Sequence, residues 1–225
     1  MIDYLQYLDI ELFKFLNGFY SEYFDCLAWL ISGKLTWLPL YIILLVVVLS
    51  RGWRQALIVI IAVVVTVTLC DQITSSLIKP AVERLRPSHS EELSSIVHIV
   101  RGHVGGRYGF LSSHAANTFG VATLLACIFR RKSFTITILA WALVVSYSRI
   151  YLGVHYPGDV LCGAVMGALL GGCIYLLTRR IVKVPVCKTI KIMPYESGKI
   201  RLASIGVALN VLILVVWATA QYLML

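Results

Sequence analysis

The chain has 225 residues, of which 59% are hydrophobic and 14% charged, and its mean hydropathy is +0.85. Soluble domains are about 45–50% apolar and about 25% charged, so this composition excludes an ordinary soluble domain, and its hydrophobicity excludes a disordered chain. The formal net charge of +9 would suggest a nucleic-acid partner in a soluble protein, but in a membrane protein basic loops are the first explanation.

The first 34 residues predict helices that lie on the membrane or partly enter it. Apolar residues alternate with charged ones over residues 1–18, which is typical of an amphipathic helix at a membrane surface. The apolar run 24–32 is too short to span a bilayer alone. It either joins the next apolar segment as one broken span or forms part of an extra crossing.

Six longer apolar segments follow, and a spanning helix needs about 20 such residues. These segments cover residues 35–50, 55–78, 112–129, 134–147, 158–178 and 202–225. The sequence therefore predicts an all-α, polytopic transmembrane helix bundle of about six spans. We expect a core over residues 35–201, which includes a long loop at 79–111, and a C-terminal transmembrane helix over 202–225.

Basic residues mark one face of this bundle. The loops after the first, third and fifth spans contain 12 of the 20 lysines and arginines and one acidic residue, Glu196. Since cytoplasmic loops are enriched in lysine and arginine, this face is predicted to be cytoplasmic. The loop 79–111 and the turn 149–157 then face outward, and little of the charge is left to support a nucleic-acid partner.

Several other features favour structural roles. Gly163, Gly167 and Gly171 are spaced by four residues, which favours close helix contact within the bundle over formation of a homodimer. Asp71, inside the second span, is expected to make a structural hydrogen bond. The six cysteines contain no C-x-x-C pair and the loop histidines have no tight ligand spacing, so no metal site is predicted.

Two polar segments stand at the predicted outward face, where ionisable groups at membrane depth are costly. Lys79 and Arg86 bracket the stretch before Pro87, and alone they are better explained as side chains that reach for the membrane surface. Ser112 is a candidate N-cap of the third span, with His114 in its first turn. The free backbone N–H groups of such a helix start bind anions.

A third polar segment contains Arg149, His155 and Asp159. A carboxylate four residues after a histidine can hold one ring nitrogen and leave the other as a nucleophile, although a structural hydrogen bond is the alternative. The topology places all three segments at one face. Three cations and a helix N-terminus then form an anion cage, while two histidines supply a nucleophile and a general acid. This set fits phosphoryl transfer through a phosphohistidine.

The three segments resemble the signature of the type 2 phosphatidic acid phosphatase (PAP2) superfamily, which also includes the vanadium haloperoxidases. The family pattern is K-x6-R-P, then P-S-G-H, then S-R-x5-H-x3-D. The first and third parts are complete in Lys79, Arg86, Pro87, Ser148, Arg149, His155 and Asp159. The second part departs from the pattern, because Leu111 replaces the proline and Ser113 the glycine, while Ser112 and His114 are kept.

The resemblance implies a PAP2-like core and a metal-independent phosphatase or diphosphatase that uses no cofactor. It implies that His155 attacks phosphorus, that Asp159 holds the other ring nitrogen, and that His114 protonates the leaving oxygen and then activates water. The phosphate-binding residues that it implies are Lys79, Arg86, Ser112, Ser113 and Arg149.

The substrate implied by the resemblance is a phosphate or diphosphate on a membrane lipid, bound at the outer face of a bacterial cytoplasmic membrane. Undecaprenyl diphosphate, lipid A phosphate, phosphatidylglycerophosphate and phosphatidic acid all remain open. Two other classes also remain open: a vanadate-dependent haloperoxidase-like enzyme, against which the apolar composition argues, and a catalytically silent lipid-binding protein, against which the complete set of histidines and aspartate argues.

Overall fold

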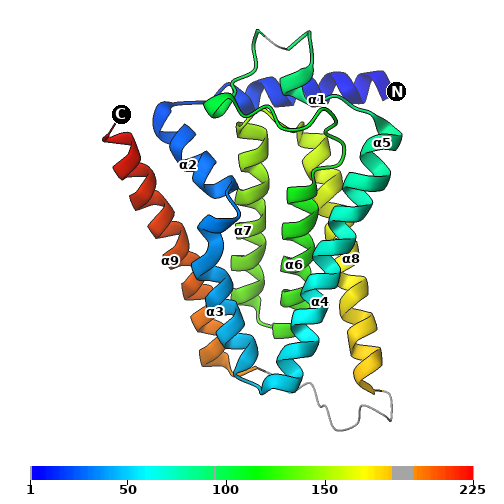
Figure 1. Ribbon diagram of the computed structural model, residues 1–225, viewed down its shortest axis with the longest axis vertical. Coiled ribbons are helices and arrows are strands. Elements are labelled where there is room, and N and C mark those ends of the chain that lie inside the picture. Colours follow the sequence, from blue (N-terminus) through cyan, green and yellow to red (C-terminus); the bar gives the residue numbers. More distant parts are fainter. Residues whose placement is uncertain (1, 94, 184–194, 225) are drawn as a thin grey trace.

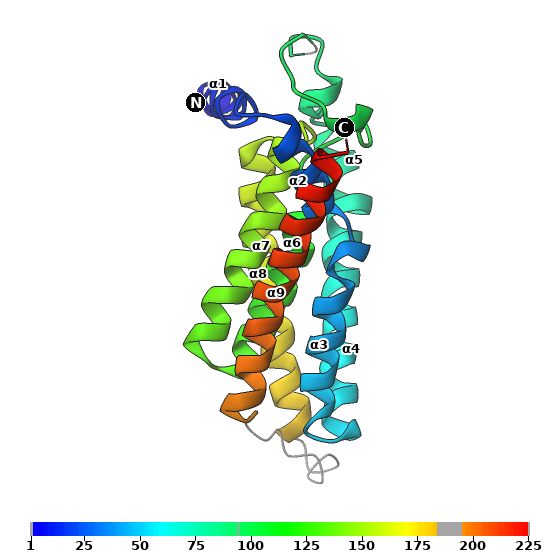
Figure 2. The same ribbon diagram turned by 90° about the vertical axis from the view of Figure 1, so that its left-hand side faces the viewer.

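The computed structural model describes residues 2–93, 95–183 and 195–224. Its long helices run side by side as a bundle, and one helix, α1 (Ile2–Asn17), lies across one end of that bundle (Figures 1 and 2). Both termini and the loop after α5 (Lys79–Val82) lie at this same end. The predicted all-α transmembrane bundle is confirmed.

The remaining helical elements follow in chain order. They are α2 (Glu22–Ser32), η1 (Leu35–Trp37), α3 (Leu38–Leu49), α4 (Trp53–Gln72), η2 (Ile73–Ile78), η3 (Pro87–His89), η4 (Val100–Gly102), α6 (Ser113–Phe129), α7 (Lys132–Tyr151), α8 (Pro157–Lys183) and α9 (Ser197–Tyr222).

Four of the described helical stretches are long and apolar enough to cross a membrane: Trp53–Val82, Lys132–Tyr151, Pro157–Ile181 and Ser197–Tyr222. Helices α2 and α3 are long and apolar enough only when taken together, as a pair bent by 76° that is either a broken span or a re-entrant loop. Helix α6, at 17 residues, is shorter. Each of the six predicted segments is therefore a helix, and length and apolarity support four to five of them as spans.

Helix α1 is fastened to the bundle by a few side chains. Phe13 is buried, and its ring packs edge-on against Tyr156 with 5.4 Å between the centroids. Asn17 donates to the backbone carbonyls of Ile150 and Tyr151 at the end of α7. The other side of α1 leaves large apolar residues exposed, as an interfacial helix requires. The division of the chain into an N-terminal part (1–34), a core (35–201) and a C-terminal transmembrane helix (202–225) stays a prediction.

Helices α6 and α8 touch along their backbones. A Cβ atom on Gly167 would lie 2.1 Å from the carbonyl oxygen of Ala116, and one on Gly171 would lie 2.2 Å from that of Gly120. Real Cβ contacts are never this short, so only glycine fits at these two positions. The glycine run therefore packs within the bundle, and it sets the spacing between the two helices that carry His114 and Asp159.

The described parts of the predicted cytoplasmic loops lie at the end opposite α1 (Figure 1). The turn between α3 and α4 holds Arg51, whose guanidinium lies 3.8 Å from the carboxylate of Glu196 before α9. The turn between α6 and α7 holds Arg130 and Arg131. Lys188 and Lys191, which were counted in the third basic loop, lie outside the described residues.

Candidate active site

The first two polar segments meet at the end of the bundle where α1 lies. A π-helical turn, η2, precedes Lys79, whose ammonium group donates to the hydroxyl of Ser113 at 2.7 Å. The hydroxyl of Thr74 lies 2.8 Å from the same Ser113 oxygen. Ser113, which departs from the family pattern, therefore ties Lys79 to the start of α6.

Arg86 is held by the backbone of the loop that follows α5. Its Nε donates to the carbonyl of Tyr108 and its Nη1 to the carbonyl of Val154, both at 3.2 Å. Its side chain is almost fully buried. Gly105 adopts a φ of +67°, and a Cβ atom there would lie 2.8 Å from the Arg86 Nη1 atom. The loop thus closes over Arg86 and fixes its guanidinium next to the turn that carries His155.

Ser112 caps α6, as predicted. Its hydroxyl accepts from the backbone N–H of Ala115, and its own N–H donates to the carbonyl of Asp159 at 3.0 Å. Both groups are engaged in the fold, and Ser112 does not line the cavity described below. Its expected role in phosphate binding stays a prediction, while its contacts hold the start of α6 against the start of α8.

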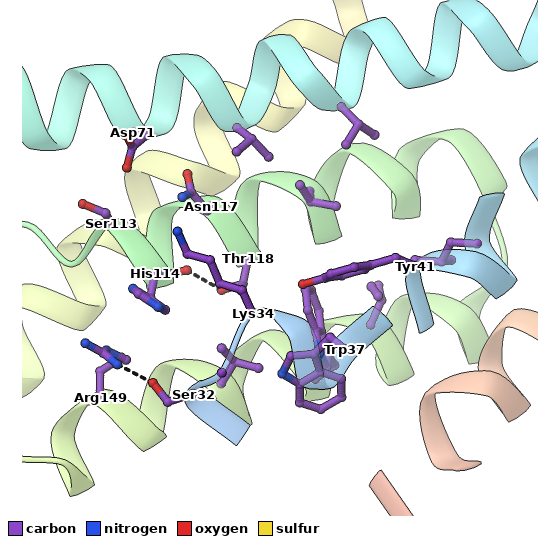
Figure 3. Close-up of a pocket in the computed structure, with 18 of the residues that line it drawn as sticks. Ser32, Lys34, Trp37, Tyr41, Asp71, Ser113, His114, Asn117, Thr118 and Arg149 are labelled. Carbon is purple, nitrogen blue, oxygen red and sulfur yellow. Dashed lines mark hydrogen bonds between the residues drawn. The ribbon is translucent and has the colours of Figure 1, made fainter. Parts of the chain in front are cut away.

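Arg149 lies in the last turn of α7 and is buried. Its Nη1 donates to the hydroxyl of Ser32 at the end of α2, and its Nε has no hydrogen-bond partner among the described residues. Figure 3 shows His114 next to Arg149, both at the wall of a cavity. A cation with an unused N–H beside a histidine suits a phosphate oxygen.

His155 and Asp159 face each other in the buried turn between α7 and α8. The His155 Nδ1 atom lies 3.4 Å from the Asp159 Oδ2 atom, which also accepts from the N–H of Tyr156 at 3.0 Å. Burial, followed by the charges of Arg86 and Arg149, lowers the pKa of His155 well below its ordinary value. The lowered pKa favours the neutral imidazole, the form in which one ring nitrogen offers a lone pair.

A cavity of about 960 Å³ runs from these residues into the bundle. Its polar end includes six of the eight predicted site residues: Lys79, Arg86, Ser113, His114, Arg149 and His155. Asp159 lies behind His155, fully buried. Below the polar end, aliphatic and aromatic side chains of α3, α4, α6 and α7 form the wall. The site can thus hold an anion at one end and an apolar group along its depth.

The cavity wall also contains polar residues that were not predicted from the sequence as parts of the site. Lys34, at the break between α2 and α3, and Asn117, three residues after His114, both line the cavity near Thr118 (Figure 3). A lone cation between two apolar runs was the signal for Lys34, and the i+3 spacing from His114 was the signal for Asn117. Asp71, expected to make a structural hydrogen bond, also lines the cavity.

A further missed residue lies between the two predicted cations. Arg84 donates from Nη1 to the Asp159 Oδ1 atom at 2.9 Å and from Nη2 to the Asp9 Oδ2 atom at 2.8 Å. The signal was a third cation within the same charged stretch, but its acidic partners are each 75 residues away in the sequence.

The three loop histidines have separate partners. His98 lies 2.8 Å from a carboxylate oxygen of Asp25, and His89 lies 3.3 Å from the carbonyl of Gly105. The ring of His103 packs edge-on against Trp29. Within the described ranges, no group of three or more histidine, cysteine or acidic side chains is placed to hold a metal ion.

Comparison with known proteins adds to this geometry. The family model described as "PAP2 superfamily" matches residues 55–183. A protein named lipid A 4'-phosphatase from Bacteroides thetaiotaomicron is 40% identical over 183 residues, which cover 80% of this chain and 81% of that protein. A protein of the same name from Porphyromonas gingivalis is 37% identical over 77% of this chain and 74% of its own.

Two solved structures share the fold. The crystal structure of LpxE from Aquifex aeolicus superposes with a TM-score of 0.55 at 23% identity, covering 77% of this chain and 95% of that one. The PAP2-type phosphatidylglycerolphosphate phosphatase from Bacillus subtilis gives a TM-score of 0.60 at 22% identity, covering 80% and 88%. At such identities these likenesses concern the fold alone.

Proposed function

The chain belongs to the PAP2 superfamily, and on that premise we propose that it is an integral membrane phosphatase that removes the 4'-phosphate from lipid A. The observation that carries this proposal is the 40% identity, over four-fifths of the chain, to a protein of that name. Among the lipids left open by the sequence, lipid A phosphate is therefore favoured over undecaprenyl diphosphate, phosphatidylglycerophosphate and phosphatidic acid.

The shape of the cavity supports a lipid substrate. Tyr41 and Leu45 of α3 and Ile60 and Val64 of α4 line it, and all four side chains are exposed. We infer from this exposure that the cavity opens between α3 and α4, toward the bilayer. A lipid phosphate can reach the cations while its acyl chains stay against apolar side chains.

In the first chemical step that we propose, the Nε2 atom of His155 attacks phosphorus and the bond to the leaving sugar oxygen breaks. His114 gives its proton to that oxygen, and Asp159 stabilises the imidazolium from the Nδ1 side. Lys79, Arg86 and Arg149 stabilise the charge on the three equatorial oxygens, with Ser113 holding Lys79 in place. The product of this step is a phosphohistidine and the free lipid alcohol.

In the second step, His114 accepts a proton from water as the water oxygen attacks phosphorus. The bond between phosphorus and Nε2 breaks, phosphate leaves, and both histidines return to their starting states. No cofactor takes part in this scheme, since the cations and the two histidines supply the charge and the protons. The partners are the lipid substrate and the bilayer.

The substrate proposal is tested with a matched pair of lipids. Purified protein in detergent is given lipid A that carries only the 4'-phosphate or only the 1-phosphate, and phosphate release and product mass are measured. We expect turnover of the first lipid and at least a tenfold slower reaction with the second, and we expect EDTA to leave the rate unchanged. Equal rates would reject the 4' assignment, preferential hydrolysis of phosphatidic acid would reject lipid A, and full loss with EDTA would reject the metal-free scheme.

We also propose that the site faces outward from a bacterial cytoplasmic membrane, because the basic loops lie at the opposite end of the bundle. Ser95, in the loop at the site end, and Ser133, at the start of α7, are both exposed. In intact cells an impermeant maleimide should label Ser95→Cys but should label Ser133→Cys only after lysis, with the unsubstituted chain as background. The reverse pattern would invert the orientation.

A further inference from the structure

We propose that Asp9 and Arg84 are positioning residues for the Asp159–His155 pair, so that α1 forms part of the active site. The inference rests on the proposed phosphatase function, but its geometry stands on contacts alone. Asp9 lies outside the three motif segments, and Arg84 occupies one of the unspecified positions between Lys79 and Arg86 in the first of them.

The guanidinium of Arg84 bridges two carboxylates from opposite parts of the chain. It donates to Asp159 on α8 at 2.9 Å and to Asp9 on α1 at 2.8 Å. Its other side lies over the ring of Tyr156, with 4.1 Å between the guanidinium carbon and the ring centroid. The Asp159 side chain is fully buried, while those of Arg84 and Asp9 are only 20% and 14% exposed. A carboxylate buried to this degree needs a charged partner, and Arg84 supplies it.

Asp9 makes a second contact that fixes the start of α8. Its Oδ1 atom accepts from the backbone N–H of Gly158 at 2.7 Å. The N–H groups of the first helical turn lack partners within their own helix, and an acidic side chain there is favourable for the helix dipole. A Cβ atom on Gly158 would lie 2.7 Å from the Asp9 Oδ2 atom, so glycine permits the approach. Asp9, on another helix, thus caps the start of α8 at Gly158, the residue directly before Asp159.

These contacts determine which way the Asp159 carboxylate points. Arg84 occupies its Oδ1 atom, so Oδ2 is the atom left for the Tyr156 N–H and for the His155 Nδ1 atom. Without Arg84 the carboxylate is free to rotate. His155 would then lose the oxygen that holds its ring with Nε2 toward phosphorus, and small errors in such geometry cost large factors in rate. Only the planar fork of arginine spans both carboxylates, so lysine is not an adequate substitute.

Kinetics of the full-length protein in detergent test this role. We expect Arg84→Gln to lower kcat by about 100-fold and Asp9→Asn by about tenfold, with KM changed by less than about threefold, because the substrate-binding cations are untouched. Arg84→Lys should recover only a small part of the loss. Glu11→Gln on the same helix, where Glu11 pairs with Lys14 at the surface, and Arg54→Gln at the far end should stay within about twofold of wild type.

A double-mutant cycle separates positioning from a general structural effect. In an Asp159→Asn background, Arg84→Gln should lower kcat by less than about threefold, since the group through which Arg84 acts has lost its charge. The full 100-fold loss in that background would overturn the inference, as would single variants with wild-type kcat.

A second measurement does not depend on the substrate. In protein labelled with ¹⁵N-histidine, the ring nitrogen signals of His155, assigned with His155→Asn, report its tautomer and its contact with Asp159. They should change in Arg84→Gln and Asp9→Asn but not in Glu11→Gln. If the wild type hydrolyses no lipid, the proposed function is rejected. The His155 signals of the variants still test whether Arg84 and Asp9 position the Asp159–His155 pair. Unchanged His155 signals in both variants would overturn it.

Discussion

Replacing His155 with alanine is expected to lower kcat by a factor of about 10,000 or more and to remove the phosphoenzyme altogether. The reason is that the proposed covalent intermediate is carried by the Nε2 atom of this ring, which lies in the cavity wall with Asp159 behind it. The measurement is acid-sensitive phosphate incorporation from ³²P-labelled lipid after a rapid alkaline quench. A phosphoenzyme that still forms in His155→Ala would place the nucleophile on another residue.

A second histidine–aspartate pair in the same chain provides the control. His98 lies 2.8 Å from Asp25, with its ring stacked on Tyr20, but it lies outside the cavity lining. His98→Ala should therefore keep the phosphoenzyme, whatever it does to thermal stability. His114→Ala should slow the reaction least for substrates whose leaving alcohol has a low pKa, because such alcohols need no proton. Equal slowing for all leaving groups would contradict the acid role of His114.

The sequence predicted the parts of the site that belong to local patterns. The six apolar segments with little charge are helices of the bundle. The four-residue spacing places His155 in the turn before α8 and Asp159 in the first turn of α8. Lys79, Arg86 and Arg149 could be placed together because the topology brings their three segments to one face. These inferences required only segment order, helix length and charge.

The parts that escaped prediction depend on contacts between distant segments. Arg84 forms ion pairs with both Asp9 and Asp159, which lie far from it in the chain. The spacing of apolar and polar residues along the sequence cannot predict such contacts. The bend between α2 and α3 brings Ser32 into contact with Arg149 and places Lys34 in the cavity wall. The apolar residues of these two segments do not reveal that bend. The Ser113 hydroxyl, which appeared only as a departure from the family pattern, turned out to be the partner of Lys79.

The glycines of α8 connect the fold to the chemistry, since the distance between α6 and α8 sets the distance between their first turns. At the site end, the N–H of Ser112 on α6 donates to the carbonyl of Asp159 on α8. One turn deeper, a Cβ atom on Gly163 would lie 2.6 Å from the carbonyl oxygen of Ser112. A substitution that separates the two helices therefore also separates His114 from the His155–Asp159 pair.

Gly167→Val is expected to destabilise the protein by at least about 3 kcal/mol and to abolish activity, because its Cβ would overlap the backbone of Ala116 and backbone cannot move aside as a side chain can. Gly172→Ala is the matched control, since nothing lies within 4 Å of the Cβ position there. That substitution should leave activity intact and stabilise α8 by up to about 1 kcal/mol through helix propensity.

Thermal unfolding in detergent, followed by tryptophan fluorescence and size-exclusion chromatography, measures both variants. Gly163→Ala gives an intermediate case: the overlap with the Ser112 carbonyl lies at the end of the interface, so the bundle should still fold while kcat falls. If Gly167→Val were as stable and as active as Gly172→Ala, α6 and α8 could not be in backbone contact. The approach of His114 to the His155–Asp159 pair would then have to come from the loop 83–112 rather than from the packing of these two helices.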